Sequence, residues 1–72
     1  MIMIYTGPTT SADKRTLMGS YDAWKQLTPR LDASLTRRID QELMRNRDKP
    51  LIKIDFGITE ARTILDRARA AN

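Results

Sequence analysis

The stretch Lys49–Ala71, KPLIKIDFGITEARTILDRARAA, decides the fold because its apolar residues change from the period of a strand to that of a helix. Ile52, Ile54 and Phe56 alternate with charged residues, as in a strand with one buried face and one face in water. After Gly57 the apolar residues recur at i, i+3, i+4 and i+7, which is the stripe of an amphipathic helix; they are Ala61, Ile64, Leu65 and Ala68. We therefore predict a strand followed by a helix that lies back over it.

The join between this strand and this helix carries its own signals. Gly57 allows the positive φ that some sharp turns require. Thr59 is then the expected N-cap, accepting the backbone N–H of Ala61 or Arg62. Pro50 precedes the strand, where no ladder N–H is needed.

The N-terminal segment Met1–Tyr5 is apolar and β-prone, and it predicts a first strand. Gly7, Pro8 and the two threonines after them predict a turn that leads to an N-cap at Thr10 or Ser11.

A first helix is expected from about Ala12 to Leu27, because Leu17, Tyr21 and Trp24 fall on one side of a helical projection. The pair Gly19-Ser20 interrupts this segment, so two short helices with Ser20 capping the second are the alternative. Trp24 and Tyr21 are assigned to the core rather than to an exposed aromatic anchor, because so short a chain has few large side chains to bury.

A second helix is predicted from Pro29 to about Arg45, with Thr28 as N-cap and Pro29 at the first helical position. Its buried side is a stripe of one apolar residue every four, namely Leu31, Leu35, Ile39 and Leu43. The polar run NRDK then forms a loop before Pro50.

The expected fold is thus a small single α+β domain over residues 1–72, in the order β-α-α-β-α, with a two-stranded sheet covered by helices. Two strands make a marginal sheet, so either a further strand lies in the loops or a second subunit, as in a homodimer, extends the sheet. The N-terminal strand is the expected exposed edge.

Composition removes several kinds of chemistry. The 72 residues contain no Cys and no His, which excludes thiolate and imidazole metal sites, histidine bases and Ser-His or Cys-His nucleophiles. No pair among the nine carboxylates stands out as a catalytic dyad, so we expect no enzymatic activity, no cofactor and no metal. The apolar run MIMIY has no basic leader and is far too short for a membrane span, and we expect a soluble, cytoplasmic protein.

One side of the predicted second helix gathers basic and polar residues away from the Leu/Ile stripe, with no acid among them. The net charge is +4 and nine of the thirteen basic residues are arginine, whose planar fork suits carboxylates and phosphates. Ser34 belongs to this side, and Lys49 continues the basic run past the helix. The partner-binding residues that we predict are Arg30, Arg37, Arg38, Gln41, Arg45 and Arg47.

The predicted third helix serves as a comparison. Arg62 and Arg69 flank Asp66 at helical spacing, so we expect this side to be neutralised internally and to be structural. An ordinary solvated face, with Arg38 paired to Glu42, is the alternative for the second helix.

Two functions follow from the basic face. The first is a non-catalytic binding protein that inhibits or regulates a larger protein by binding an acidic surface of that protein through the basic helix face. Small phage and mobile-element proteins show the same economy. The second is a nucleic-acid-binding regulator that uses the same arginines on phosphates. A helix-turn-helix is one form of it, although Pro29 stands where such turns often carry Gly. The sequence neither supports nor excludes capture of a small ligand.

Overall fold

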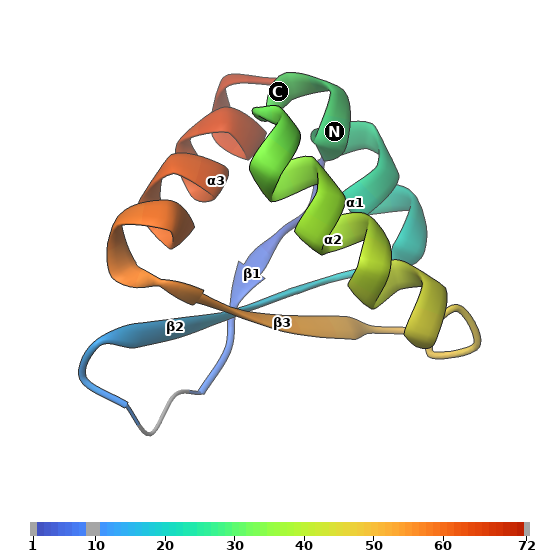
Figure 1. The fold of residues 1–72 in the computed structure, drawn as a ribbon, viewed down its shortest axis with the longest axis horizontal. Helices are drawn as coiled ribbons and strands as arrows, with labels where there is room; N and C mark the ends of the chain where they lie inside the picture. Colours follow the sequence, from blue (N-terminus) through green and yellow to red (C-terminus); the bar gives the residue numbers. More distant parts are fainter. Residues whose placement is uncertain (1, 9–10, 72) are drawn as a thin grey trace.

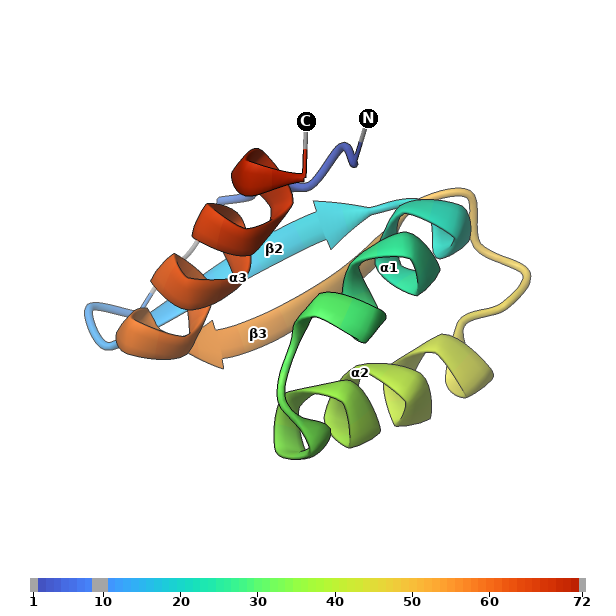
Figure 2. The same cartoon turned by 90° about the horizontal axis from the view of Figure 1, so that it is seen from above.

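The computed structural model describes residues 2–8 and 11–71. In these residues the elements are, in chain order, β1 (Tyr5–Thr6), β2 (Lys14–Gly19), α1 (Tyr21–Leu27), one turn of 3-10 helix (Thr28–Arg30), α2 (Ala33–Arg45), β3 (Ile52–Gly57) and α3 (Ile58–Ala70). The strands form one antiparallel sheet in the order β1-β2-β3. The α-helices lie together on one face of this sheet (Figures 1 and 2), so the chain is a small, compact α+β domain of two layers.

The register of the sheet decides which side chains meet the helices. Leu17 of β2 pairs with Ile54 of β3, and Arg15 pairs with Phe56, so these four residues point to the helical side. Thr16 and Asp55 form the next pair on the opposite face, where the Thr16 hydroxyl donates to Asp55 Oδ1 at 2.5 Å.

The core lies between the sheet and the three α-helices that the described residues form. Trp24 of α1 is fully buried, its ring centroid lies 6.1 Å from that of Phe56, and its indole N–H donates to the Ile52 carbonyl at 3.2 Å. The assignment of Trp24 to the core is therefore confirmed. The stripes predicted for the second and third helices also supply buried residues, namely Leu35, Ile39, Leu43, Ala61, Ile64 and Ala68, while Leu31 and Leu65 are partly buried against them.

The prediction of a helix from Ala12 is wrong, because Lys14–Gly19 forms the central strand β2. Leu17 satisfies both patterns, since it is a core residue whether the segment is a strand or a helix. Gly19 ends this strand; it is buried, and a Cβ at this position would lie 2.6 Å from Ile4 Cδ1 and 3.3 Å from Trp24 Nε1. The two-stranded sheet and the order β-α-α-β-α are consequently wrong, whereas the α+β class is confirmed.

The N-cap of α1 was predicted correctly from the local sequence, whereas that of α2 was not. Ser20 caps α1, as the alternative with two segments predicted, and its hydroxyl accepts the Ala23 N–H at 3.1 Å. Thr28 does not cap α2; Thr28 and Pro29 open the 3-10 turn, and Asp32 is the N-cap, accepting the Leu35 N–H at 2.9 Å. The carboxylate of Asp32 is the stronger acceptor for a helix N-terminus, which has a positive partial charge.

The turn from β3 into α3 also differs from expectation. Gly57 has φ −62° rather than a positive φ and is itself the N-cap residue, so α3 begins two residues before the predicted start at Glu60. Thr59 lies in the first turn, where its carbonyl accepts the Thr63 hydroxyl at 3.2 Å. The Glu60 carboxylate accepts the Gly57 N–H at 3.3 Å, which satisfies one free amide at the helix start.

Some N-terminal predictions fall beyond what the structure covers. The predictions outside the described residues are those for Met1, for the Thr9-Thr10 part of the turn and for the cap at Thr10. Ser11 lies in the connection between β1 and β2. β1 is an edge of the sheet as predicted, although it covers Tyr5–Thr6 rather than Met1–Tyr5. Extension of the sheet by a second subunit stays a prediction.

Over the described ranges, no helix combines the length and apolar character that crossing a membrane requires.

Candidate functional site

The solvent side of α2 is held outward by the burial of its opposite side. Leu35, Ile39 and Leu43 are buried against the sheet, so residues about half a helical turn away must face water. We call the outward-facing set the outer face of α2; its members are Ser34, Arg37, Gln41, Met44 and Arg45.

The structure leaves most of the predicted binding residues exposed. Arg37 and Gln41 lie at the middle of the outer face, and Arg37 forms no ion pair with any described residue. Arg45 lies 3.5 Å from Glu42, an ion pair at the surface with the arginine side chain 74% exposed. Such a pair contributes little to stability, so Arg45 stays accessible to another acid.

Arg30 and Arg47 are exposed at the two ends of α2 rather than on the helix itself. Arg30 closes the 3-10 turn before the helix, and Arg47 lies two residues beyond the last helical residue, Arg45. Lys49 is exposed further along the same connection, where its N–H donates to the Asn46 carbonyl. These cations therefore extend the positive surface beyond both ends of the outer face.

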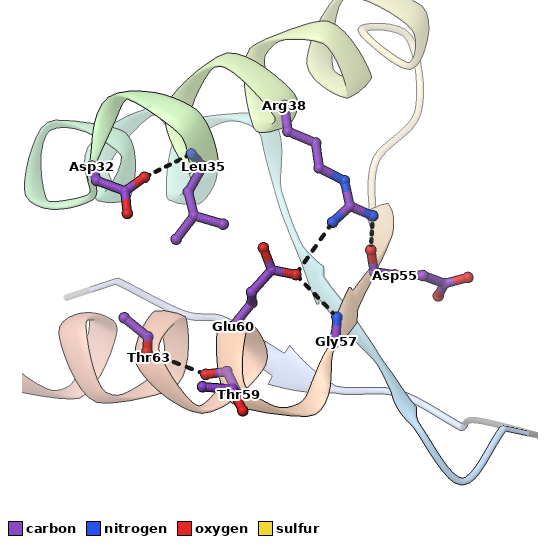
Figure 3. Close-up of polar contacts among 8 residues, drawn as sticks. All are labelled: Asp32, Leu35, Arg38, Asp55, Gly57, Thr59, Glu60 and Thr63. Atoms are coloured by element: carbon purple, nitrogen blue, oxygen red, sulfur yellow. Dashed lines mark hydrogen bonds and ion pairs between the residues drawn. The ribbon is translucent and has the colours of Figure 1, made fainter.

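Arg38 lies apart from the other predicted residues, because its side chain reaches from α2 to the edge of β3 (Figure 3). Its guanidinium donates to the Asp55 carbonyl, lies 3.8 Å from the Glu60 carboxylate and covers the Phe56 ring at 4.8 Å from the centroid. The predicted alternative pair between Arg38 and Glu42 does not form; Glu42 pairs with Arg45 instead. Arg38 thus has a role within the fold.

Met44 is the residue of this face that sequence reasoning missed. It is 75% exposed, the most exposed of the large apolar residues that the structure describes. Met44 lies one turn beyond Gln41 and two turns beyond Arg37, so all three share one side of the helix. Its position off the Leu/Ile stripe is visible on a helical projection, and that signal would have found it.

A shallow groove of about 250 Å³ borders Met44 between α1 and α2, and Tyr21 and Leu43 contribute to its walls. Across the same groove, Lys25 Nζ lies 3.6 Å from Asp40 Oδ1 and links the two helices. This oxygen is occluded from solvent and has no hydrogen-bond donor, so the Lys25 ammonium is its only compensation among the described residues.

The chemistry available on this surface is recognition by charge and by apolar contact. An arginine fork binds a carboxylate through two parallel hydrogen bonds, and a thioether adapts to irregular apolar surfaces. In the part of the chain that the structure describes, no group of three or more acids gathers closely enough to hold a metal ion.

Comparison of the chain with protein-family models, with curated proteins and with solved structures found no match in any of the three.

Proposed function

We propose that this protein is a non-catalytic binding protein that regulates a larger protein by laying the outer face of α2 on an acidic surface of it. The observation that carries the proposal is the exposed Met44 on the same side of α2 as Arg37, which forms no ion pair with any described residue. A partner that offers carboxylates around an apolar contact matches both side chains.

The charge of the outer face supports an acidic partner. Arg37 and Arg45 project from it without an acid between them on that side, and Arg30 and Arg47 add positive charge at the ends. Complementary charges raise the rate of association and orient the two surfaces. Arg38 is not part of the proposed contact, because its guanidinium is held by Asp55 and Glu60.

Met44 favours a protein over a nucleic acid as the partner. Burial of a Met side chain releases about 1.5–3 kcal/mol when the contact is apolar, and nucleic-acid backbones offer mostly phosphate and sugar to a helix face. Aromatic residues, Met and Arg are enriched in the centres of protein interfaces. Binding of nucleic acid by the same arginines is the competing outcome of the experiment below.

Site-specific photo-cross-linking in the cells that make the protein tests the proposal. A photoreactive side chain at Gln41 reports on the outer face of α2, and the same group at Thr63 on α3 is the matched control position. We expect position 41, and not position 63, to capture one acidic protein, and Arg37→Glu to abolish that capture. Arg67→Glu on α3 makes the same change of charge elsewhere and should leave the capture intact.

Two outcomes contradict the proposal. Equal capture from positions 41 and 63 would mean that the outer face of α2 is not a specific contact. Capture of nucleic acid at position 41, weakened steeply by salt, would assign these arginines to phosphate binding instead.

A further inference from the structure

A groove of about 370 Å³ lies between α3 and the β1–β2 hairpin, away from the outer face of α2. Its walls combine the apolar side chains of Ile58 and Leu65 with three arginines, Arg15, Arg62 and Arg69. The volume falls within the range of about 300–1,000 Å³ that is typical of small-molecule sites.

The fold brings Arg15 of β2 to the side of α3 that carries Arg62 and Arg69. Arg15 pairs with Phe56 in the sheet, so it projects on the helical side at the end of β3 from which α3 starts. Arg62 lies one turn after Ile58, and Arg69 follows two turns later, about 10 Å further along the helix axis. Arg69 also borders a second groove, beside residues 2–5, and therefore marks the far end of the first.

The charges in this groove are not neutralised as the sequence suggested. Among the described residues of the lining Asp66 is the only acid, and no ion pair within 4 Å joins it to Arg62 or Arg69. Three arginines and one aspartate leave a net charge of +2 on the lining. Like charges that are held near one another without a counter-charge favour binding of an anion.

We propose that this groove binds a small organic phosphate. The phosphate lies between Arg15 and Arg62, each of which supplies charge-assisted hydrogen bonds from its guanidinium fork. The organic part of the ligand covers Leu65 and Ile58. Asp66 accepts from an N–H or O–H donor at the far end of the ligand, which explains an acid among the arginines.

Titration of the ¹⁵N-labelled full chain, followed by amide chemical shifts, tests this proposal. Phenyl phosphate is the main probe, because it combines a phosphate group with an apolar ring. Inorganic phosphate tests the phosphate group alone, and benzyl alcohol tests the apolar ring alone. We expect saturable shifts with phenyl phosphate at Arg15, Thr6 and along the groove side of α3. Inorganic phosphate should bind about tenfold more weakly, because it lacks the apolar contact.

Substitutions separate the groove from general attraction to a basic protein. Arg15→Gln and Arg62→Gln should each weaken binding of phenyl phosphate about tenfold, the loss expected for one charge-assisted contact. Arg67→Gln, on the other side of α3, and Arg37→Gln, on α2, remove the same charge and should leave affinity unchanged. All four side chains are exposed, and the spectra of the free variants verify that they fold.

Three results would overturn the proposal: no saturable shift with phenyl phosphate at millimolar concentration, an equal loss of affinity in Arg67→Gln, or equal affinity for inorganic phosphate. None of these results bears on the partner of α2, because that partner is tested at Gln41 on another surface.

Discussion

The guanidinium of Arg38 lies over the ring of Phe56, 4.8 Å from its centroid, and closes the free edge of β3. The Thr16 carbonyl accepts the Gly7 N–H, so the backbone groups of Thr16 point toward β1. Asp55 is the cross-strand partner of Thr16, so it forms no backbone hydrogen bonds with β2 at this pair. Its carbonyl therefore points outward, away from β2, at the exposed edge of β3. Arg38 donates to that carbonyl, and Glu60 accepts the Gly57 N–H on the same edge (Figure 3). Two paired side chains thereby satisfy two backbone groups of this exposed edge, the Asp55 carbonyl and the Gly57 N–H.

Replacing Arg38 should destabilise the fold. We expect Arg38→Ala to lower the free energy of unfolding by about 1–2 kcal/mol, because it removes a cation–π contact and a hydrogen bond to the backbone. The ion pair with Glu60 adds little, since the Arg38 side chain is 42% exposed. Urea denaturation measures the change. Arg37→Ala is the control and should stay within about 0.5 kcal/mol of the parent chain; equal losses in the two variants would contradict the role of Arg38.

The same substitution should also promote self-association. In Arg38→Ala the Asp55 carbonyl loses its donor, and the edge of β3 becomes a template for pairing with another strand. Sedimentation velocity over a range of concentrations should show a larger apparent mass for Arg38→Ala than for the parent chain. Identical masses throughout would mean that the edge is protected by other means.

Replacement of Gly by Ala should cost more stability at Gly19 than at Gly57. Gly19→Ala should cost about 1–3 kcal/mol of stability, as overpacking of a core does, because the new methyl group would lie 3.3 Å from both the Met3 carbonyl oxygen and Trp24 Nε1, while Ile4 Cδ1, at 2.6 Å, would have to move. Gly57→Ala should cost less than about 1 kcal/mol, the usual difference between Gly and Ala at an N-cap, because its nearest neighbour lies at 3.4 Å and its φ is negative. Thermal or urea unfolding compares the two. If residues 12–27 were one helix, Gly19→Ala would stabilise the chain instead.

Met44→Gln should separate binding from stability. Gln has a similar length and helix propensity, so the free energy of unfolding should change by less than about 0.5 kcal/mol. Affinity for the protein captured through Gln41 should fall about tenfold, as is typical when an apolar anchor of an interface is lost. Calorimetry with that protein measures the loss. Unchanged affinity would remove Met44 from the contact, while a lowered stability would show that Met44 packs within the fold.

The sequence alone identified the secondary structure wherever the apolar pattern is local and fits one kind of element. The alternation of Ile52, Ile54 and Phe56 identifies β3, and the Leu/Ile stripe places the buried side of α2, because each period fits one kind of element. Lys14–Gly19 carries one strongly buried side chain, Leu17, which fits a strand and a helix equally well. Pairing with β1 and β3, and not propensity, decided for the strand.

The candidate binding surfaces were likewise determined in part by the sequence and in part by the tertiary structure. The order of residues along α2 determined that Arg37 and Gln41 face water, because they lie on the side of the helix opposite the buried Leu/Ile stripe. Only the tertiary structure decided that Arg38 serves the edge of β3, and that Arg15 joins Arg62 in a groove where no ion pair to Asp66 forms. A helical projection predicts neighbours within one helix, but the partner of a long, flexible arginine is set by whichever acid, carbonyl or ring another element brings within its reach.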